Sequence, residues 1–265
     1  MSNILIIDSG LKPGWTKKTA DTIIEMLSIN GTHSIDRINI REEQIEACRG
    51  CALCLDRGED KCINHGDSAG KILTKMMWAD GIITITPNYS LNVPWNLKNL
   101  YDRLAFLFHR PRLFGKTSAV FVLQGVYGGG KVLNYIDELM SFWGCKTVKG
   151  AVLTGGLYPN TTISAAILDK NGKRCRKVLQ RFEKSLADSK PKRPSFFKLA
   201  IFRMTRGSMK YSDEVCPADK AYFREKGWID SKYYYEVKLG PLHTAFGAIM
   251  DSMIKHMILK QQKKQ

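Results

Sequence analysis

Short apolar runs recur along the first part of the chain. They lie at residues 3–8, 34–40, 81–86, 118–123 and 146–153. The first of them, NILIID at residues 3–8, is apolar at consecutive positions, which is typical of a strand buried on both faces of a parallel sheet. Together the five segments predict five strands.

Segments with apolar residues three and four positions apart separate and follow these runs. They predict helices near residues 19–27, 68–78, 95–108, 132–142 and 162–187. Strands that alternate with helices form a parallel sheet with right-handed crossovers. The predicted fold class is therefore α/β, with a doubly wound five-stranded parallel sheet.

The pattern changes at SKPKRPS, residues 189–195, where two prolines and three basic residues predict a linker. We therefore expect one domain over residues 1–188 and a basic, aromatic-rich, mainly helical extension over residues 189–265. Near the end, LHTAFGAIMDSMIKHMILK has apolar residues at three- and four-residue steps and predicts an amphipathic helix. A lid, a dimer arm and a surface-docking segment are all open as roles for the extension.

The net charge of +16 is concentrated in this extension, where residues 190–265 hold 16 Lys and Arg against 7 Asp and Glu. A basic surface attracts nucleotides, anionic lipid or nucleic acid. No helix-turn-helix or RNA-binding aromatic motif is present, so we expect no nucleic-acid partner. Contact with a membrane surface stays open, because PSFFKLAIFRMTR has the composition of an interfacial helix.

The apolar runs also bear on location. None approaches the roughly 20 residues that cross a bilayer, and the first residues lack the features of a signal peptide. We therefore expect a cytoplasmic protein with reduced thiols.

Candidate chemistry lies in the links after the strands, because ligands of open parallel sheets bind at the carboxyl ends of strands. The first link offers the hydroxyls of Ser9 and Thr16, the flexible backbone of Gly10 and Gly14, and a helix N-terminus, which together suit a phosphate. Neither a G-x-G-x-x-G fingerprint nor a complete P-loop is present. A mononucleotide phosphate is the favoured ligand, and a turn residue with a helix cap is the alternative.

Two further links could hold a planar heterocycle. PNYSLNVP, residues 87–94, places Tyr89, Ser90 and Asn92 after the third strand, and QGVYGGG after the fourth strand permits close approach of a ligand to the backbone. No Ser-His-acid arrangement stands out, so we do not expect a hydrolase.

The segments SGLKPGWT, PNYSLNVPWNLKNLYDRL and QGVYGGG, in this order, resemble the NAD(P)H-dependent FMN reductases of flavodoxin-like fold over roughly the first 155 residues. The resemblance implies FMN as cofactor, NAD(P)H as co-substrate and a small electron acceptor such as a quinone, a nitro or azo compound or a flavin. It also implies a homodimer or homotetramer, and no catalytic side chain, because the cofactor carries the chemistry. The implied FMN-binding residues are Ser9, Lys12, Gly14, Trp15, Thr16, Pro87, Asn88, Tyr89, Ser90, Leu91, Asn92, Gln124, Gly125, Gly128 and Gly129.

Four of the seven cysteines lie in one short segment, CRGCALCLDRGEDKC. Two-residue gaps between Cys48, Cys51 and Cys54 let three thiolates surround a 4Fe-4S cluster, and Cys62 could supply the fourth ligand. A zinc site and a segment that binds no metal are the alternatives. The motif is similar to that of the iron-sulfur flavoproteins, which implies electron transfer with an electron-carrier protein.

A different class of function also stays open. The fold could serve a non-enzymatic membrane-surface or regulatory module whose basic extension docks on acidic surfaces.

Overall fold

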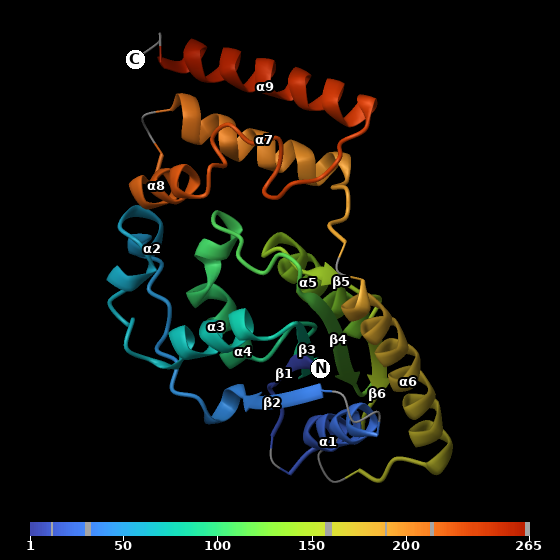
Figure 1. Cartoon of the computed structure of the whole chain (residues 1–265). Coiled ribbons are helices and arrows are strands. Elements are labelled where there is room, and N and C mark those ends of the chain that lie inside the picture. The colour runs from blue at the N-terminus through green and yellow to red at the C-terminus, as the bar shows by residue number, and fades with distance from the viewer. Residues whose placement is uncertain (12, 30–32, 157–160, 189, 213–214, 263–265) are drawn as a thin grey trace. The chain divides into compact units, whose positions relative to one another are not determined.

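The computed structural model describes the whole chain except residues 12, 30–32, 157–160, 189, 213–214 and 263–265 (Figure 1). The chain forms two compact units. The first unit comprises Met1–Arg49 and Gly66–Ser189, and the second comprises Gly50–His65 and Lys190–Gln265. The cysteine segment thus groups mostly with the C-terminal extension, although the sequence analysis places it within residues 1–188.

The first unit is built on a parallel sheet with strand order β2-β1-β3-β4-β5 and with β6 also paired to β4 (Figure 1). This order confirms the predicted doubly wound, flavodoxin-like sheet. The strands are β1 Ser2–Asp8, β2 His33–Asn39, β3 Gly81–Pro87, β4 Thr117–Gln124, β5 Lys146–Thr147 and β6 Ala151–Thr154. The larger helices are α1 Trp15–Ser28, α3 Ser68–Trp78, α4 Trp95–Arg103, α5 Gly129–Phe142 and α6 Ala165–Ala187.

Helices cover both faces of the sheet because its strands are apolar on both sides. Side chains such as Ile6, Ile83 and Phe121 form one core cluster with residues of α1 and α6. The alternate positions on the same strands point to the opposite face, where α3 contacts β1 and α5 contacts β4. All seven residues of β3 are buried.

The fifth predicted strand is interrupted. The sequence predicts one strand over residues 146–153, but the structure has β5 and β6 with residues 148–150 between them, and both strands pair with β4. At Gly150 an added Cβ would lie 2.2 Å from the carbonyl oxygen of Val120, which is far inside contact distance. Only glycine allows the backbone to pass β4 this closely.

Side chains of α6 occupy the free edge of β6. Asn171 accepts a hydrogen bond from the Thr154 amide (3.1 Å) and donates one to the Thr154 carbonyl (2.8 Å). Arg174 donates to the Val152 carbonyl (2.7 Å). Within the described part of the sheet β6 pairs only with β4, so these side chains satisfy backbone groups that another strand would otherwise bind.

The second unit is helical, as the sequence analysis predicts for the extension. It contains α2 Leu53–Asp56, α7 Phe196–Tyr211, α8 Pro217–Glu225 and α9 Pro241–Gln262. Helices α7 and α9 lie side by side (Figure 1), and α2 packs on α8. The core of this unit is aromatic, with edge-to-face contacts among Phe202, Phe223, Trp228, Tyr233 and Tyr234. No helix among the described residues is both long and apolar enough to cross a bilayer.

Candidate functional site

A cavity of about 230 Å³ opens at the carboxyl ends of β1, β3, β4 and β6, within the first unit. This is the edge of the sheet at which the sequence analysis expects the ligand. The cavity is lined by Leu11, Pro13, Gly14, Trp15, Thr16, Pro87, Asn88, Tyr89, Leu123, Gln124, Gly125, Gly155 and Gly156.

The first link reaches the cavity through the N-terminus of α1. Gly14 caps the helix without a side-chain hydrogen bond, and the first turn contains no acidic residue. The amide groups of the first turn and the positive end of the helix dipole therefore favour an anion at Trp15 and Thr16. Gly10 permits this geometry, because a Cβ there would lie 2.2 Å from the Cβ of Thr16.

Ser9 has a different place from the one expected. It is fully buried and its hydroxyl donates to Thr86 (2.8 Å), so it joins the ends of β1 and β3 and does not line the cavity. Lys12, another predicted residue, lies outside the described residues.

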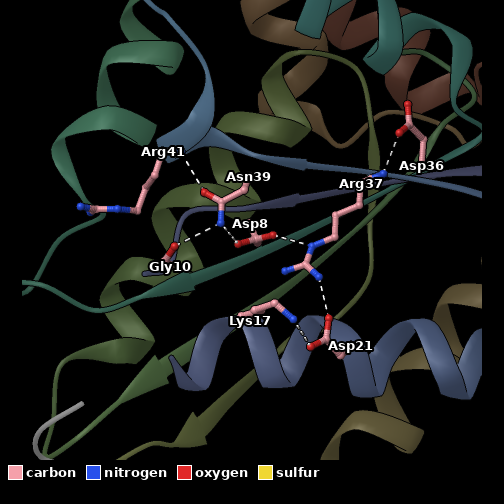
Figure 2. A network of polar contacts seen from close by, with 8 residues as sticks. All are labelled: Asp8, Gly10, Lys17, Asp21, Asp36, Arg37, Asn39 and Arg41. Atoms are coloured by element: carbon pink, nitrogen blue, oxygen red, sulfur yellow. Dashed lines mark hydrogen bonds and ion pairs between the residues drawn. The ribbon is translucent and has the colours of Figure 1, made fainter. Parts of the chain in front are cut away.

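Asp8, the last residue of β1, is a buried carboxylate at the start of the first link and belongs to a network of polar contacts (Figure 2). Asp8 accepts hydrogen bonds from Arg37 (2.8 Å) and from Asn39 (2.9 Å), and Asn39 also donates to the carbonyl of Gly10 (3.2 Å). Burial opposes the charge on Arg37, but the hydrogen bonds and charges of Asp8 and Asp21 raise the pKa of the guanidinium above its usual value. The Arg37 guanidinium therefore offsets the negative charge of Asp8, which reduces the repulsion that an anion at the N-terminus of α1 would meet.

The second link places Pro87, Asn88 and Tyr89 on the cavity wall. Asn88 donates through its Nδ2 to the Tyr127 carbonyl (2.7 Å), whereas its Oδ1 is buried and has no hydrogen-bond partner among the described residues. An unpaired buried acceptor is unfavourable and gains from a donor supplied by a ligand. The Tyr89 ring is 44% exposed and offers an aromatic surface.

The remaining predicted residues of this link form the turn behind the wall. Ser90 and Leu91 have positive φ angles of 50° and 64°, and Tyr89 and Asn92 exchange backbone hydrogen bonds of 2.9 Å. None of Ser90, Leu91 and Asn92 lines the cavity. Two non-glycine residues in the left-handed region mark a strained turn, a feature that clusters at ligand sites.

The third link contributes Gln124 and Gly125 directly. The Gln124 side chain accepts a hydrogen bond from the Gly129 amide (2.7 Å) and thereby fixes the loop. Gly128 has a φ of 92°, and a Cβ there would lie 2.4 Å from Leu91, so the third link packs tightly on the second. Gly128 and Gly129 shape the loop without lining the cavity.

Several lining residues were missed by the sequence analysis. Gly155 and Gly156 follow β6, so a fourth link completes the cavity. Their adjacency directly after an apolar run was a usable signal, because the same reasoning identified the other three links.

The cysteine segment is anchored at its start by α4, the helix that follows the second link. Asn99 accepts a hydrogen bond from the Cys48 amide (3.0 Å) and donates to the Ile45 carbonyl (3.1 Å). Arg103 donates to the Glu46 carbonyl (2.9 Å) and forms an ion pair with Asp67. The base of the segment is thus fixed on the first unit.

The thiols themselves are not assembled into a metal site. Cys48 and Cys51 are exposed, and Cys54 and Cys62 are half-buried. Across the described ranges, which include all four cysteines, no three His, Cys, Asp or Glu side chains are gathered to hold a metal ion. This arrangement does not fit the predicted 4Fe-4S cluster.

Comparison with known proteins identifies the family. Residues 2–157 match the family model for NADPH-dependent FMN reductase. The chain is 26% identical to an iron-sulfur flavoprotein of Archaeoglobus fulgidus over 86% of this chain and all of that protein, and 30% identical to an iron-sulfur flavoprotein of Methanosarcina thermophila over 57% of this chain and 81% of that protein.

A solved structure shares the fold over about two thirds of the chain. The FMN-dependent NADH-azoreductase of Bacillus anthracis, in complex with FMN, aligns with a TM-score of 0.54 and 15% identity over 68% of this chain and 99% of that one. The family model, however, rests on sequence and covers more than half of the chain. It favours an enzyme over the non-enzymatic module, and the chain therefore belongs to the NADPH-dependent FMN reductase family, as an oxidoreductase.

Proposed function

We propose that the cavity at the carboxyl ends of the strands binds FMN and that the protein passes electrons from NAD(P)H to a small acceptor. The observation that carries this proposal is the cavity itself, whose lining includes the N-terminus of α1, which has no side-chain cap, and Asn88, whose Oδ1 has no partner among the described residues. Bound FMN would supply the redox chemistry, accepting a hydride from the nicotinamide and reducing the acceptor.

The residues of the chain divide the work of binding. The backbone at Trp15 and Thr16 would hold the phosphate, because the α1 dipole and free amides favour an anion there. Asn88 would accept a hydrogen bond from the edge of the ring system. The Tyr89 ring would pack against one face of the FMN ring system, which would exclude water from that face and orient the flavin.

Some of the other predicted FMN-binding residues would shape the site without contacting FMN through their side chains. Ser9 fixes the ends of β1 and β3, and the glycines at 125 and 128 allow the third link to approach the ring. Quinones, nitro and azo compounds and flavins remain the proposed acceptors, since a cofactor-borne reaction requires only stacking and access. We also propose a homodimer or homotetramer, which light scattering on the eluted protein would measure.

Titration of the purified chain with FMN, followed by flavin fluorescence quenching, tests the proposal. We expect one FMN per chain and flavin-dependent oxidation of NADH or NADPH with p-benzoquinone. Asn88→Ala should weaken FMN binding about three- to tenfold, because one hydrogen bond contributes roughly 0.5–1.5 kcal/mol. Asn134→Ala, at an exposed position of α5, is the matched control. A chain that binds no FMN, or equal affinities of the two variants, would contradict the assigned site.

An iron-sulfur flavoprotein that exchanges electrons with a carrier protein is the second candidate. It is favoured by the spacing of Cys48, Cys51, Cys54 and Cys62 and by the similarity to the Archaeoglobus fulgidus protein along its whole length. Because the described thiols are not assembled, a cluster would require the segment to rearrange. Iron and acid-labile sulfide assays on protein purified without oxygen decide between the candidates. About four irons per chain support the cluster, and flavin without iron leaves the simple reductase.

A further inference from the structure

Helix α9 has two apolar sides, of which only one is covered. Gly247, Ile254 and Ile258 are buried, and Gly207 of α7 allows close packing, since a Cβ there would lie 2.5 Å from Ile254. The opposite side carries four apolar residues with exposed fractions of 76%, 58%, 60% and 50%: Leu242, Ile249, Met253 and Met257. Steps of seven and four residues place them on one side of the helix, which we call the outer face.

The charged side chains of α9 also differ between its inner and outer sides. Its one acidic residue, Asp251, faces α7 and forms ion pairs with Arg203 (2.6 Å) and Arg206. The Nζ of Lys255 lies 5.8 Å from the centre of the Tyr211 ring of α7, so this lysine belongs to the inner side of the helix. Lys260 is exposed and follows Met253 by seven residues, which places it on the outer face. Among the described charged side chains of α9, the outer face therefore carries a lysine and no carboxylate.

An apolar face with positive charge indicates what kind of surface could cover it. An apolar face that carries a lysine can bind the boundary between headgroups and acyl chains of an anionic bilayer, where a nearby cation contributes about 1 kcal/mol. The net charge of +16 strengthens attraction to anionic lipid.

We propose that the outer face of α9 docks on an anionic lipid membrane. The helix would lie in the plane of the interface, with Leu242, Ile249, Met253 and Met257 entering the headgroup region and Lys260 facing lipid phosphates. The sequence leaves contact with a membrane surface open for PSFFKLAIFRMTR, and in the structure Leu199 and Phe202 of that segment are buried. The outer face shares no residue with the proposed flavin site, and this proposal does not depend on the proposed function.

Co-sedimentation of the full chain with vesicles tests the proposal. We expect binding to phosphatidylcholine vesicles that contain 30% phosphatidylglycerol, at least tenfold weaker binding to pure phosphatidylcholine, and weakening by 500 mM salt. Ile249→Asp should reduce binding about tenfold or more. Ala221→Asp, which adds the same charge at an exposed position of α8, should change binding less than twofold.

Circular dichroism melting of each variant checks that folding is retained, and Leu242→Ser provides a second, milder change at the most exposed position of the outer face. Absence of sedimentation with anionic vesicles would overturn the proposal. So would equal binding by the Ile249→Asp and Ala221→Asp variants. A dimer in light scattering that Ile249→Asp converts to a monomer, without vesicle binding, would assign the outer face to a second copy instead.

Discussion

Strand β3 and helix α9 are both rich in apolar residues, yet they differ in how those residues are used. Every residue of β3 is buried, because helices cover both faces of its sheet. In α9 the residues at 247, 254 and 258 are buried, and the outer face is exposed. Apolar content alone therefore does not predict burial. The number of neighbouring elements decides it, and an uncovered apolar face indicates a surface for interaction.

Matched truncations should show the largest difference between the two elements. Ile83→Ala removes a fully buried side chain and should lower the free energy of unfolding by about 2–5 kcal/mol, whereas Ile249→Ala should change it by less than about 0.5 kcal/mol. Urea unfolding followed by circular dichroism measures both. Equal losses would mean that the outer face is packed in solution.

Gly150→Val tests whether close backbone approach, in addition to apolar burial, holds the sheet. A Cβ at this position would overlap the Val120 carbonyl, so β6 must shift from β4, and we expect a loss of about 2–4 kcal/mol. Gly130→Ala serves as the control, because no atom lies within 4 Å of its added Cβ. It should be neutral or should stabilise by less than about 1 kcal/mol. A harmless valine at 150 would contradict the explanation for the interrupted strand.

Asp251→Asn tests the ion pairs that hold the inner side of α9. Arg203 and Arg206 would lose their carboxylate while staying largely buried, so we expect a loss of about 1–3 kcal/mol in urea unfolding. Asp169→Asn, which breaks an exposed pair with Lys173, should cost less than about 1 kcal/mol. Comparable effects of the two substitutions would show that the α7–α9 ion pairs are as weak as a surface pair.

The smallest expected effect concerns a buried acid on α5. Burial raises the pKa of Asp137 to about 7, and its Oδ1 has no partner among the described residues. In the unfolded chain the Asp137 carboxyl ionises near pH 4. Between about pH 4 and 7 the folded state therefore binds more protons than the unfolded state, and the free energy of unfolding falls as the pH rises through that range. Asp137→Asn should remove this loss and stabilise the protein at pH 8 by about 1–2 kcal/mol, after allowance for solvent screening. Melting temperatures at pH 5 and pH 8 check it, and a pH-independent difference between the proteins would contradict it.

Local sequence patterns predicted most of the strands and helices of the first unit, because these depend on residues that are close in sequence. The five apolar runs match strands to within a residue or two, except for the fifth, and Ser68–Trp78 matches α3 at both ends. The interruption at residues 148–150 could not be predicted, because it depends on the contact of Gly150 with Val120 thirty residues away.

The same distinction applies to the cavity. Eight of the predicted FMN-binding residues line it, namely Gly14, Trp15, Thr16, Pro87, Asn88, Tyr89, Gln124 and Gly125. Their assignment to FMN stays a prediction. Ser9 was expected at the cavity, but its hydroxyl is directed to Thr86, a pairing that depends on the order of the strands and not on local sequence.

The side chains of α6 along β6 have a further consequence for the behaviour of the protein in solution. A free edge strand offers a row of amide and carbonyl groups on which another molecule can add a strand, and such addition starts amyloid-like aggregation. In this chain Asn171, Arg174 and Arg181 already bind backbone groups of β6 and of Lys149. The two arginines also add positive charge where an approaching strand would have to lie. These contacts therefore disfavour the addition of another strand along this edge.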